Sequence, residues 1–374
     1  MKIAIIAATG EGGSTVSARS HFDLISTIPE FDVVYFEIPN VAPKTLSRKY
    51  KYIFSNKIIA LLSSFFRMPI SWEFFFSYGR LPDLSNFDIV HFHWIQRRGI
   101  PLMKMDLKGK KVFWTLHDSW PLNGLIHLPD LKVHSRTKRV AIKWLSSRTK
   151  KLLGSFVERS KVSFVSPSEF IAIKCREAWP KSNVFTIRNR LHQTYLNFDN
   201  AIQGVRQNAF LFVGGESTKN DYKGSDFFFD ISKKLERSDP VSELWYVGDF
   251  SRKSSSQIPN NVKFLGQIKD SNEMRRIYTS VKATLILSGF ENYPNVALES
   301  MSCLTPVIGF DVGGIGEIVV AGSGNLHPYG DTSAVFSSMM NVDSIAPNEL
   351  LKDAREKLRV EQNKLIHNYL QIYL

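Results

Sequence analysis

Cysteine is nearly absent from the sequence, which has Cys175 and Cys303 and no Cys-x-x-Cys pair in its 374 residues. Two distant cysteines cannot build a disulfide framework or a cysteine zinc site, and their scarcity fits a reducing cytosol. No apolar run approaches the roughly 20 residues that a membrane-spanning helix needs. The N-terminal apolar stretch is short and β-branched and leads directly into Gly10. We therefore interpret it as a first strand and not as a signal peptide.

Acidic residues are outnumbered by basic ones, 35 against 48, so the net charge is +13. The excess gathers in residues 44–67, which contain no acid, and in residues 132–161, where Glu158 is the single acid. Apolar residues at helical spacing interleave with these charges. Both segments are therefore predicted to be basic amphipathic helices, of the kind that rest on an anionic membrane surface. Ordinary helices with a core-facing apolar side and a solvated charged side remain the alternative.

The same basic balance would suit a nucleic acid. The sequence, however, has no RNP-like motif, no helix-turn-helix and no zinc-finger spacing. We therefore expect no nucleic-acid partner.

Short apolar runs alternate with helix-length segments along the whole sequence, which predicts βα units and parallel sheets. The pattern breaks near residues 188–192 and then restarts, so two doubly wound α/β domains are expected, 1–188 and 189–354. Residues 352–374 are predicted to be an amphipathic helix. The predicted strands are 2–8, 33–38, 88–93, 111–116, 162–166, 184–187, 209–214, 244–248, 262–265, 283–287 and 306–310.

The segment from Ser288 to Gly313 is the most informative in the sequence. Pro294 stands where a helix begins, and Glu291 precedes that helix while Glu299 lies inside it. The helix start collects unpaired backbone N–H groups and the positive end of the dipole, which suits a phosphate. Carboxylates beside a phosphate do not hold the phosphate itself. They are better explained as acceptors for the hydroxyls of a ribose and of a sugar ring.

A glycine-rich loop follows the first strand and includes Gly12 and Gly13. Such glycines let the backbone approach an anionic ligand closely. A dinucleotide fingerprint would need a third glycine where Thr15 stands, so NAD is disfavoured. His91 and His93 share one face of a strand, but no third metal ligand is evident and no Asp-x-Asp occurs. We therefore expect no metal.

These motifs together resemble those of a known enzyme family. The matching residues are Ser288, Glu291, Pro294, Glu299, Thr305-Pro306 and Gly313-Gly314. In this order they resemble the donor site of retaining glycosyltransferases of the GT-B fold, family 4 (group 1). Residues 115–123 resemble enzymes of capsule, colanic acid and O-antigen assembly. The resemblance implies two Rossmann-like domains that face each other across a cleft, with a C-terminal helix of about 355–374 packing back on the first.

The resemblance also implies roles for individual residues. His117 would contact the transferred sugar, Glu291 the sugar hydroxyls and Glu299 the ribose. Lys223 would neutralise the diphosphate. The family's usual arginine is replaced by Gly215 or Glu216, and Lys219 is the candidate substitute. The remaining predicted binding residues are Gly12 and Gly13 near the phosphates, Gly266 and Gln267 at the base, and Asn295, Val296, Ala297 and Leu298 at the helix start.

We therefore expect a metal-independent retaining hexosyltransferase of bacterial surface polysaccharide synthesis, without a cofactor beyond its nucleotide-sugar substrate. Its acceptor would be a lipid-linked oligosaccharide on the inner face of the cytoplasmic membrane. A non-catalytic partner subunit, or a phosphorylase or epimerase of the same fold, is the alternative. The base, the sugar, the acceptor, the linkage and the oligomeric state do not follow from the sequence.

Overall fold

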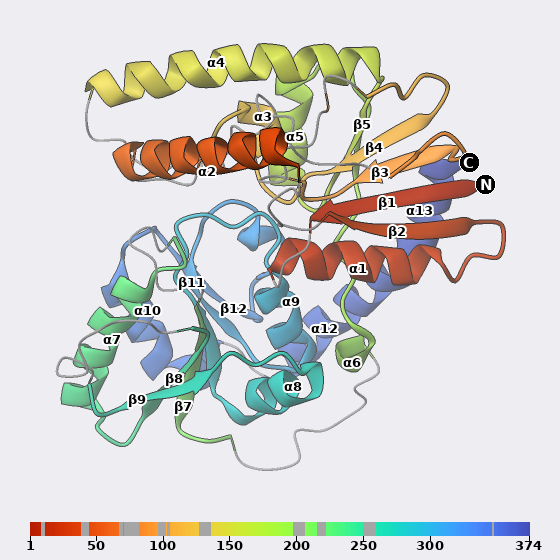
Figure 1. The fold of residues 1–374 in the computed structure, drawn as a ribbon. Coiled ribbons are helices and arrows are strands. Elements are labelled where there is room, and N and C mark those ends of the chain that lie inside the picture. Colours follow the sequence, from red (N-terminus) through yellow and green to blue (C-terminus); the bar gives the residue numbers. More distant parts are fainter. Residues whose placement is uncertain are drawn as a thin grey trace. The chain divides into compact units, whose positions relative to one another are not determined.

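The protein is represented by a computed structural model, which describes residues 1–8, 12–38, 45–66, 70, 82–95, 102, 105–126, 136–196, 206–214, 222–249, 259–345 and 348–374. These residues divide into two compact units (Figure 1). Unit 1 comprises Met1–Arg190 together with Leu365–Leu374, and unit 2 comprises Leu191–Lys364. Among the described helices, none is both long enough and apolar enough to span a membrane.

Unit 1 is built on a parallel sheet of six strands in the order β2-β1-β3-β4-β5-β6. The strands are β1 (Lys2–Ala8), β2 (Asp32–Ile38), β3 (Ile89–Phe92), β4 (Lys111–Thr115), β5 (Ser163–Ser166) and β6 (Val184–Thr186). The helices are α1 (Gly13–Ile25), α2 (Leu46–Phe66), α3 (Trp120–Asn123), α4 (Arg136–Arg159), α5 (Glu169–Ala178) and α13 (Leu365–Tyr373). The strand order reverses between β1 and β3, which is where ligands bind in such sheets.

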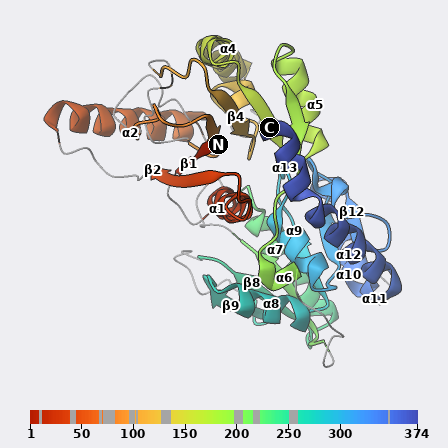
Figure 2. The same cartoon turned by 90° about the vertical axis from the view of Figure 1, so that its right-hand side faces the viewer.

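The core of unit 1 explains why the C-terminal helix belongs to it. Ile3 and Ile5 of β1 pack with Leu24 and Ile25 of α1, and Tyr373 of α13 completes the same cluster. Helix α1 lies against β1 and β2 (Figure 2). Burial of these apolar side chains is the main stabilising force of the unit.

Unit 2 has a second parallel sheet of six strands in the order β12-β11-β10-β7-β8-β9. The strands are β7 (Ala209–Val213), β8 (Glu243–Val247), β9 (Val262–Gly266), β10 (Ala283–Ile286), β11 (Val307–Phe310) and β12 (Gly324–His327). The helices are α6 (Gln193–Leu196), α7 (Ser225–Ser238), α8 (Ser271–Ser280), α9 (Asn295–Ser302), the 3-10 helix η4 (Ile315–Glu317), α10 (Thr332–Met340), α11 (Val342–Ile345) and α12 (Asn348–Asn363). Here the order reverses between β7 and β10.

Both faces of the second sheet are covered by apolar clusters. Along β7, Phe210 and Phe212 belong to one cluster, while Ala209 and Leu211 belong to the other. A strand buried on both faces is a nearly continuous apolar run, which is why the sequence pattern was visible. The α/β fold class with two doubly wound parallel sheets, predicted from the sequence, is confirmed.

Candidate functional site

The switch point of unit 2 brings together two of the predicted site residues. Lys223 follows β7 in the chain and Glu291 follows β10, and the Lys223 Nζ lies 2.7 Å from the Glu291 Oε1. The hydroxyl of Ser288 donates to the same oxygen at 2.7 Å. Lys223, Ser288, Glu291, Pro294 and Val296 all line one pocket at the ends of these strands. This pocket therefore has a cation, a carboxylate and a helix start within it.

Two glycines hold the pair in place. Gly224 has φ +88°, and a Cβ there would lie 2.0 Å from the carbonyl oxygen of Leu287. Gly313 has φ +64°, and a Cβ there would lie 1.8 Å from the carbonyl oxygen of Glu291. Only glycine fits both a left-handed backbone and such close contact. The Lys-Gly and Gly-Gly motifs are thus explained by how the two loops pack on the end of β10.

Helix α9 begins at the pocket, as the sequence predicts. Pro294 precedes it in an extended conformation and lacks a backbone N–H. The N–H groups of Ala297 and Leu298 already donate to the Pro294 carbonyl, at 3.1 and 3.4 Å. Their side chains are buried in the core, whereas Asn295 and Val296 are half-buried. A phosphate bound through Ala297 or Leu298 would share their N–H groups with the helix.

Glu299 lies further along α9, outside the residues that line the pocket. Its Oε2 accepts a hydrogen bond of 2.9 Å from the Tyr278 hydroxyl of α8. Burial raises the pKa of this carboxyl to about 7, and the Tyr278 hydrogen bond opposes that shift. Sequence reasoning missed Tyr278, because nothing in the local sequence of α8 marks it as a partner of a residue on α9.

The other residues predicted for unit 2 lie apart from this pocket or outside the described part. Gly266 ends β9 at the edge of the sheet, and Gln267 follows it; both are exposed and neither lines the pocket. Lys219 lies outside the described residues, and so do Gly215 and Glu216 at the position of the family's usual arginine.

In unit 1, the predicted glycines lie at the start of α1. Gly12 precedes the helix, and its carbonyl accepts from the N–H groups of Thr15 and Val16. Gly13 is the first helical residue. A Cβ at Gly12 would meet no atom of the described residues within 4 Å, so their packing alone does not require glycine there.

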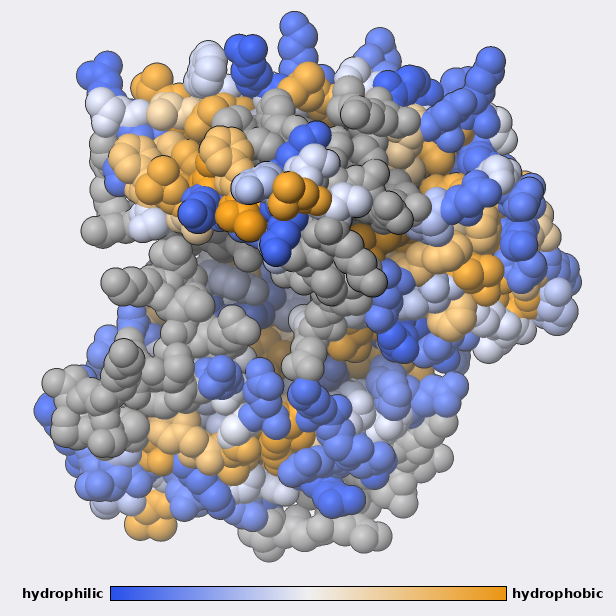
Figure 3. Space-filling view, in the orientation of Figure 1, coloured by the Kyte–Doolittle hydropathy of each residue, from blue (hydrophilic) through white to orange (hydrophobic). Residues whose placement is uncertain are grey.

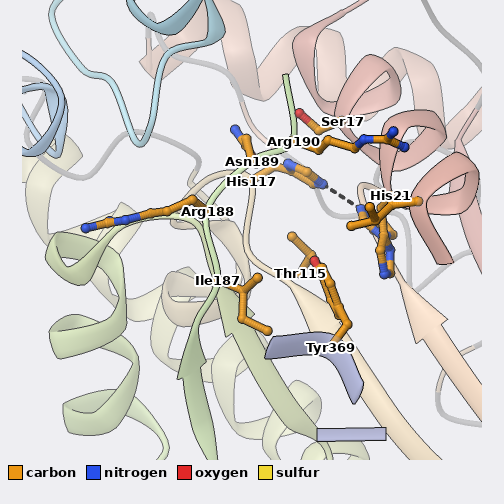
Figure 4. A pocket seen from close by; sticks show the side chains of 11 residues that line it. Ser17, His21, Thr115, His117, Ile187, Arg188, Asn189, Arg190 and Tyr369 are labelled. Atoms are coloured by element: carbon orange, nitrogen blue, oxygen red, sulfur yellow. Dashed lines mark hydrogen bonds between the residues drawn. The ribbon is translucent and has the colours of Figure 1, made fainter. Parts of the chain in front are cut away.

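His117 follows β4 and lines a pocket within unit 1 (Figure 4). The pocket is also lined by Ser17, Thr115 and the cationic side chains of Arg188 and Arg190. Burial lowers the pKa of His117 to about 4, although the nearby Asp118 opposes the shift. The ring is therefore neutral at physiological pH.

Asp118 lies two residues before α3, and its Oδ1 accepts from the N–H of Trp120, the first residue of that helix, at 2.9 Å. His117 is held by His93, whose Nδ1 lies 2.9 Å from the His117 Nε2.

His91 and His93 do share one face, as predicted, and α1 adds a residue that sequence reasoning missed. His21 Nδ1 lies 2.8 Å from the His93 Nε2. Nitrogens of His21, His91 and His93 lie within 4.8 Å of one another, near enough to share an ion. Both nitrogens of each ring, however, already have a hydrogen-bond partner in the protein.

Each unit thus has a pocket that is lined by predicted site residues. The unit 2 pocket offers a lysine for an anion and a carboxylate for hydroxyls. The unit 1 pocket offers a neutral imidazole, and Arg188 and Arg190 are among its lining residues. Phosphate and sugar groups are the ligands that such side chains bind.

Part of unit 2 matches a known family model. Residues 207–342 match the family model described as Glycosyl transferases group 1. No curated protein matches the sequence.

Solved structures resemble the whole chain. Anabaena HepE in complex with UDP has a TM-score of 0.60 at 14% identity, covering 99% of this chain and 100% of that one. The lipopolysaccharide outer core galactosyltransferase WaaB has a TM-score of 0.56 at 16% identity, with 99% and 100% covered. TarM of S. aureus has a TM-score of 0.54 at 12% identity, covering 76% of this chain and 54% of TarM.

The chain therefore spans about half the length of TarM and nearly all of HepE and WaaB. At such low identity the likeness establishes the fold. The chain has the GT-B fold of these proteins, and residues 207–342 are similar to the Glycosyl transferases group 1 family.

Proposed function

We propose that the chain is a retaining glycosyltransferase that moves a sugar from a nucleotide diphosphate to a hydroxyl of an oligosaccharide. The observation that carries this proposal is the pocket that joins Lys223, Glu291 and the start of α9 at the switch point of unit 2. The leaving group is a nucleoside diphosphate, so catalysis means stabilising the charge that develops on its phosphates. A lysine and a helix start supply that stabilisation without a metal.

The predicted residues then take separate roles. Lys223 and the N–H groups at the start of α9 bind the diphosphate, with Lys219 as a further cation. Glu291 accepts from hydroxyls of the transferred sugar, and Glu299, held by Tyr278, accepts from the ribose. His117 contacts the sugar near the reacting carbon. Gly12 and Gly13 leave room beside the phosphates, and Gly266 and Gln267 bind the base.

The solved relatives support the substrate class. HepE is described in complex with UDP, with UDP and glucose, and with UDP-glucose. WaaB is a lipopolysaccharide galactosyltransferase. For the present chain we infer a nucleoside diphosphate sugar as substrate and surface polysaccharide, such as O-antigen, as product.

We further propose that the acceptor is lipid-linked and that unit 1 docks on the inner face of the cytoplasmic membrane. Large apolar side chains are exposed along α2, namely Leu46, Tyr50, Ile53, Phe54, Leu61 and Phe65. They gather over α2 (Figure 3). The helix contains no acid, and Lys49, Lys51 and Lys57 are exposed on it. An exposed apolar stripe among cations fits an anionic lipid surface.

The main proposal is tested by thermal-shift measurements on the full chain with UDP, GDP, ADP and CMP, each with and without EDTA. Stabilisation by one nucleoside diphosphate that survives EDTA and is lost in Glu299→Ala is the expected result. If no nucleotide stabilises the chain, it is a non-catalytic subunit instead. If the chain consumes the sugar nucleotide without an acceptor, or requires inorganic phosphate, it has the chemistry of an epimerase or phosphorylase.

A further inference from the structure

Six side chains of unit 1, five of them buried and His117 half-buried, form an unbroken row of hydrogen bonds, here called the histidine network: Thr115, His91, Tyr373, His21, His93 and His117. Thr115 Oγ1 lies 2.7 Å from the His91 Nε2, and the His91 Nδ1 hydrogen bonds to the Tyr373 Oη. Tyr373 Oη lies 3.2 Å from the His21 Nε2.

From His21 the row continues to the pocket. The His21 Nδ1 lies 2.8 Å from the His93 Nε2, and the His93 Nδ1 lies 2.9 Å from the His117 Nε2. The last of these bonds is the dashed line at His117 in Figure 4. The members come from α1, β3, β4 and α13 and from the segments just after the two strands. These residues are brought together by the sheet topology and do not form a local sequence motif.

All four imidazoles of the network are neutral at physiological pH. Burial lowers the pKa of His21 to about 3 and of His117 to about 4, and lowers those of His91 and His93 well below the ordinary value. Burial also raises the pKa of Tyr373, so its hydroxyl keeps its proton. Each ring therefore has one N–H that donates and one bare nitrogen that accepts.

This rule couples the orientation of every bond in the network. If His93 donates from Nδ1 to His117, its Nε2 must accept from the His21 Nδ1–H. His21 must then accept from the Tyr373 hydroxyl, which in turn accepts from the His91 Nδ1–H. His91 finally accepts from the Thr115 hydroxyl. As long as the Tyr373 hydroxyl donates its proton to one of its two histidines, reversing any one bond reverses all of them. The network then has two states, with all four rings as Nδ1–H or all four as Nε2–H.

Thr115 distinguishes the two states. Its hydroxyl is buried and has a single proton. In the Nδ1–H state that proton goes to His91. In the Nε2–H state His91 donates to Thr115, and among the described residues no other acceptor is recorded for the Thr115 proton. A buried hydroxyl that donates to nothing is unfavourable, so the Nδ1–H state is preferred.

We propose that Thr115, His91, Tyr373, His21 and His93 are positioning residues that fix the proton of His117 on Nδ1, so that His117 presents a hydrogen-bond donor to its pocket. Within the described residues, this Nδ1 is the one ring nitrogen of the network without a recorded partner. The N–H suits an oxygen acceptor on a sugar or a phosphate. It does not suit the role of a general base. The biological meaning of this orientation depends on the function proposed for His117 above.

Nuclear magnetic resonance of the full chain with ¹⁵N-labelled histidine tests the network without any substrate. Long-range ¹H–¹⁵N correlations distinguish Nδ1–H from Nε2–H rings, and single His→Gln variants assign the four signals. We expect four neutral Nδ1–H rings at neutral pH among the nine histidines of the sequence. Nε2–H rings at these positions would overturn the proposal.

Variants at the far end provide the matched comparison. Thr115→Val removes the hydroxyl at nearly constant shape, and with it the reason for the Nδ1–H preference. We therefore expect Nε2–H signals to appear beside the Nδ1–H signals, at His91 and onward to His117. Thr115→Ser keeps the hydroxyl and should restore the wild-type pattern. An unchanged pattern in Thr115→Val would contradict the coupling. Tyr373→Phe interrupts the network at a second place. The tautomers of His21, His93 and His117 should then change, while the hydrogen bond between His91 and Thr115 persists.

The same samples separate this proposal from two others. Stoichiometric Zn²⁺ that shifts the signals of His21, His91 and His93 would mean a metal site and would overturn the network as described. If the expected Nδ1–H pattern changes in Thr115→Val but sugar transfer keeps its wild-type kcat and KM, the network stands and the role proposed for His117 in transfer fails.

Discussion

The ammonium of Lys223 and the carboxylate of Glu291 form an ion pair, 2.7 Å from Nζ to Oε1, beside the first turn of α9. Neither side chain is free to turn fully toward a ligand without weakening this pair. A bound diphosphate would attract the lysine, while the hydroxyls of a bound sugar would donate to the carboxylate. The two residues thus depend on each other before any substrate arrives.

Opposite effects on nucleotide affinity are expected from the two halves of this pair. Lys223→Met should weaken binding of the nucleoside diphosphate about tenfold or more, since a charge-assisted contact to phosphate is lost. Glu291→Gln should leave that affinity unchanged or raise it, because a negative charge near the phosphates is removed. Calorimetric titration of both variants with the nucleoside diphosphate measures these affinities. Equal losses in both would mean that the pair only shapes the pocket.

Stability provides the control for that comparison. Each single variant leaves one partly buried charge without its partner, which should lower the free energy of unfolding by about 1–3 kcal/mol. The double variant Lys223→Met with Glu291→Gln should regain part of this loss while sugar transfer stays absent. Denaturant unfolding of the three variants gives the coupling energy.

Nucleotide affinity should rise with pH through about 7. The pKa of Glu299 is raised to about 7 by burial, so the carboxyl ionises across this range. A ribose hydroxyl donates more strongly to the ionised form. Titrations from pH 5.5 to 8.5 should show the rise in the wild type and a flat profile in Glu299→Gln. Tyr278→Phe removes a bond that lowers this pKa, so its midpoint should lie higher. A flat wild-type profile would exclude the ribose contact.

The stability that Glu299 contributes has the opposite pH dependence. Its folded pKa lies above the ordinary value of 4.5, so the folded state favours the protonated form. That contribution is complete below about pH 4.5 and is lost as the pH rises through about 7. A rise in nucleotide affinity with pH therefore cannot be ascribed to the contribution of Glu299 to the stability of the fold.

The histidine network should make unit 1 sensitive to acid. The unfolded histidines take up protons below about pH 6.5, whereas in the folded unit His21 does so only near 3 and His117 near 4. Stability is therefore lost as the pH falls below 6.5, by about 1.4 kcal/mol per pH unit for each such histidine.

Tryptophan fluorescence measures this loss, because six of the seven tryptophans lie in unit 1. Urea unfolding at pH 7 and pH 5.5 should show the difference. His21→Gln should reduce the slope with pH by about one histidine's share, and His367→Gln, an exposed residue of α13, should leave it unchanged. A slope that neither variant alters would place the acid sensitivity elsewhere.

How far the sequence predicts the fold depends on burial. The predicted strands are found because they are short apolar runs buried on both faces. Strand β12 was missed: Gly324–His327 has two polar residues and a glycine, and it is an edge strand that is only half-buried. Its pairing with β11 outweighs its weak local preference.

The C-terminal helix shows a different limit. Residues 352–374 have one amphipathic pattern, yet the structure has two helices, α12 and α13, with Lys364 between them. Leu358 of α12 packs in the core of unit 2, and Tyr369 of α13 packs in the core of unit 1. Periodicity reports that a face is buried and does not report which core buries it.

The candidate site could be predicted where the residue types of a local motif indicate the chemistry directly. Lys223-Gly224 and Gly313-Gly314 have loop positions and residue types that could be interpreted directly. His21, Tyr278 and Tyr373 could not be identified in this way. Each acts through a partner far away in the sequence, and the contact exists only once the sheet has formed.

Replacing apolar side chains of α2 should weaken membrane binding. Phe54→Glu and Leu61→Glu change residues that are 58% and 70% exposed, so the fold should tolerate them. In vesicle flotation with anionic lipid, each should reduce the bound fraction about tenfold, while neutral vesicles bind poorly in all cases. Val241→Glu in unit 2, at a residue 75% exposed, is the matched control and should bind as the wild type. Equal losses in all three would point to net charge alone.

Gly224 should be far less replaceable than another glycine of the same backbone conformation. Gly224 and Gly330 both have φ +88°, but a Cβ at Gly224 would lie 2.0 Å from the Leu287 carbonyl oxygen, and one at Gly330 meets nothing within 4 Å. Gly330→Ala therefore measures the left-handed strain alone, about 1–2 kcal/mol. Gly224→Ala should cost about 1–3 kcal/mol more, since the loop must move away from β10.

The displacement of that loop would carry Lys223 away from Glu291. Gly224→Ala should therefore also lose the thermal stabilisation by the nucleoside diphosphate, whereas Gly330→Ala should keep it. Thermal unfolding of both variants with and without the nucleotide measures the two effects together. If both variants lose stability equally and both still respond to the nucleotide, the close contact with Leu287 does not position Lys223. The glycine would then serve only the left-handed turn before α7.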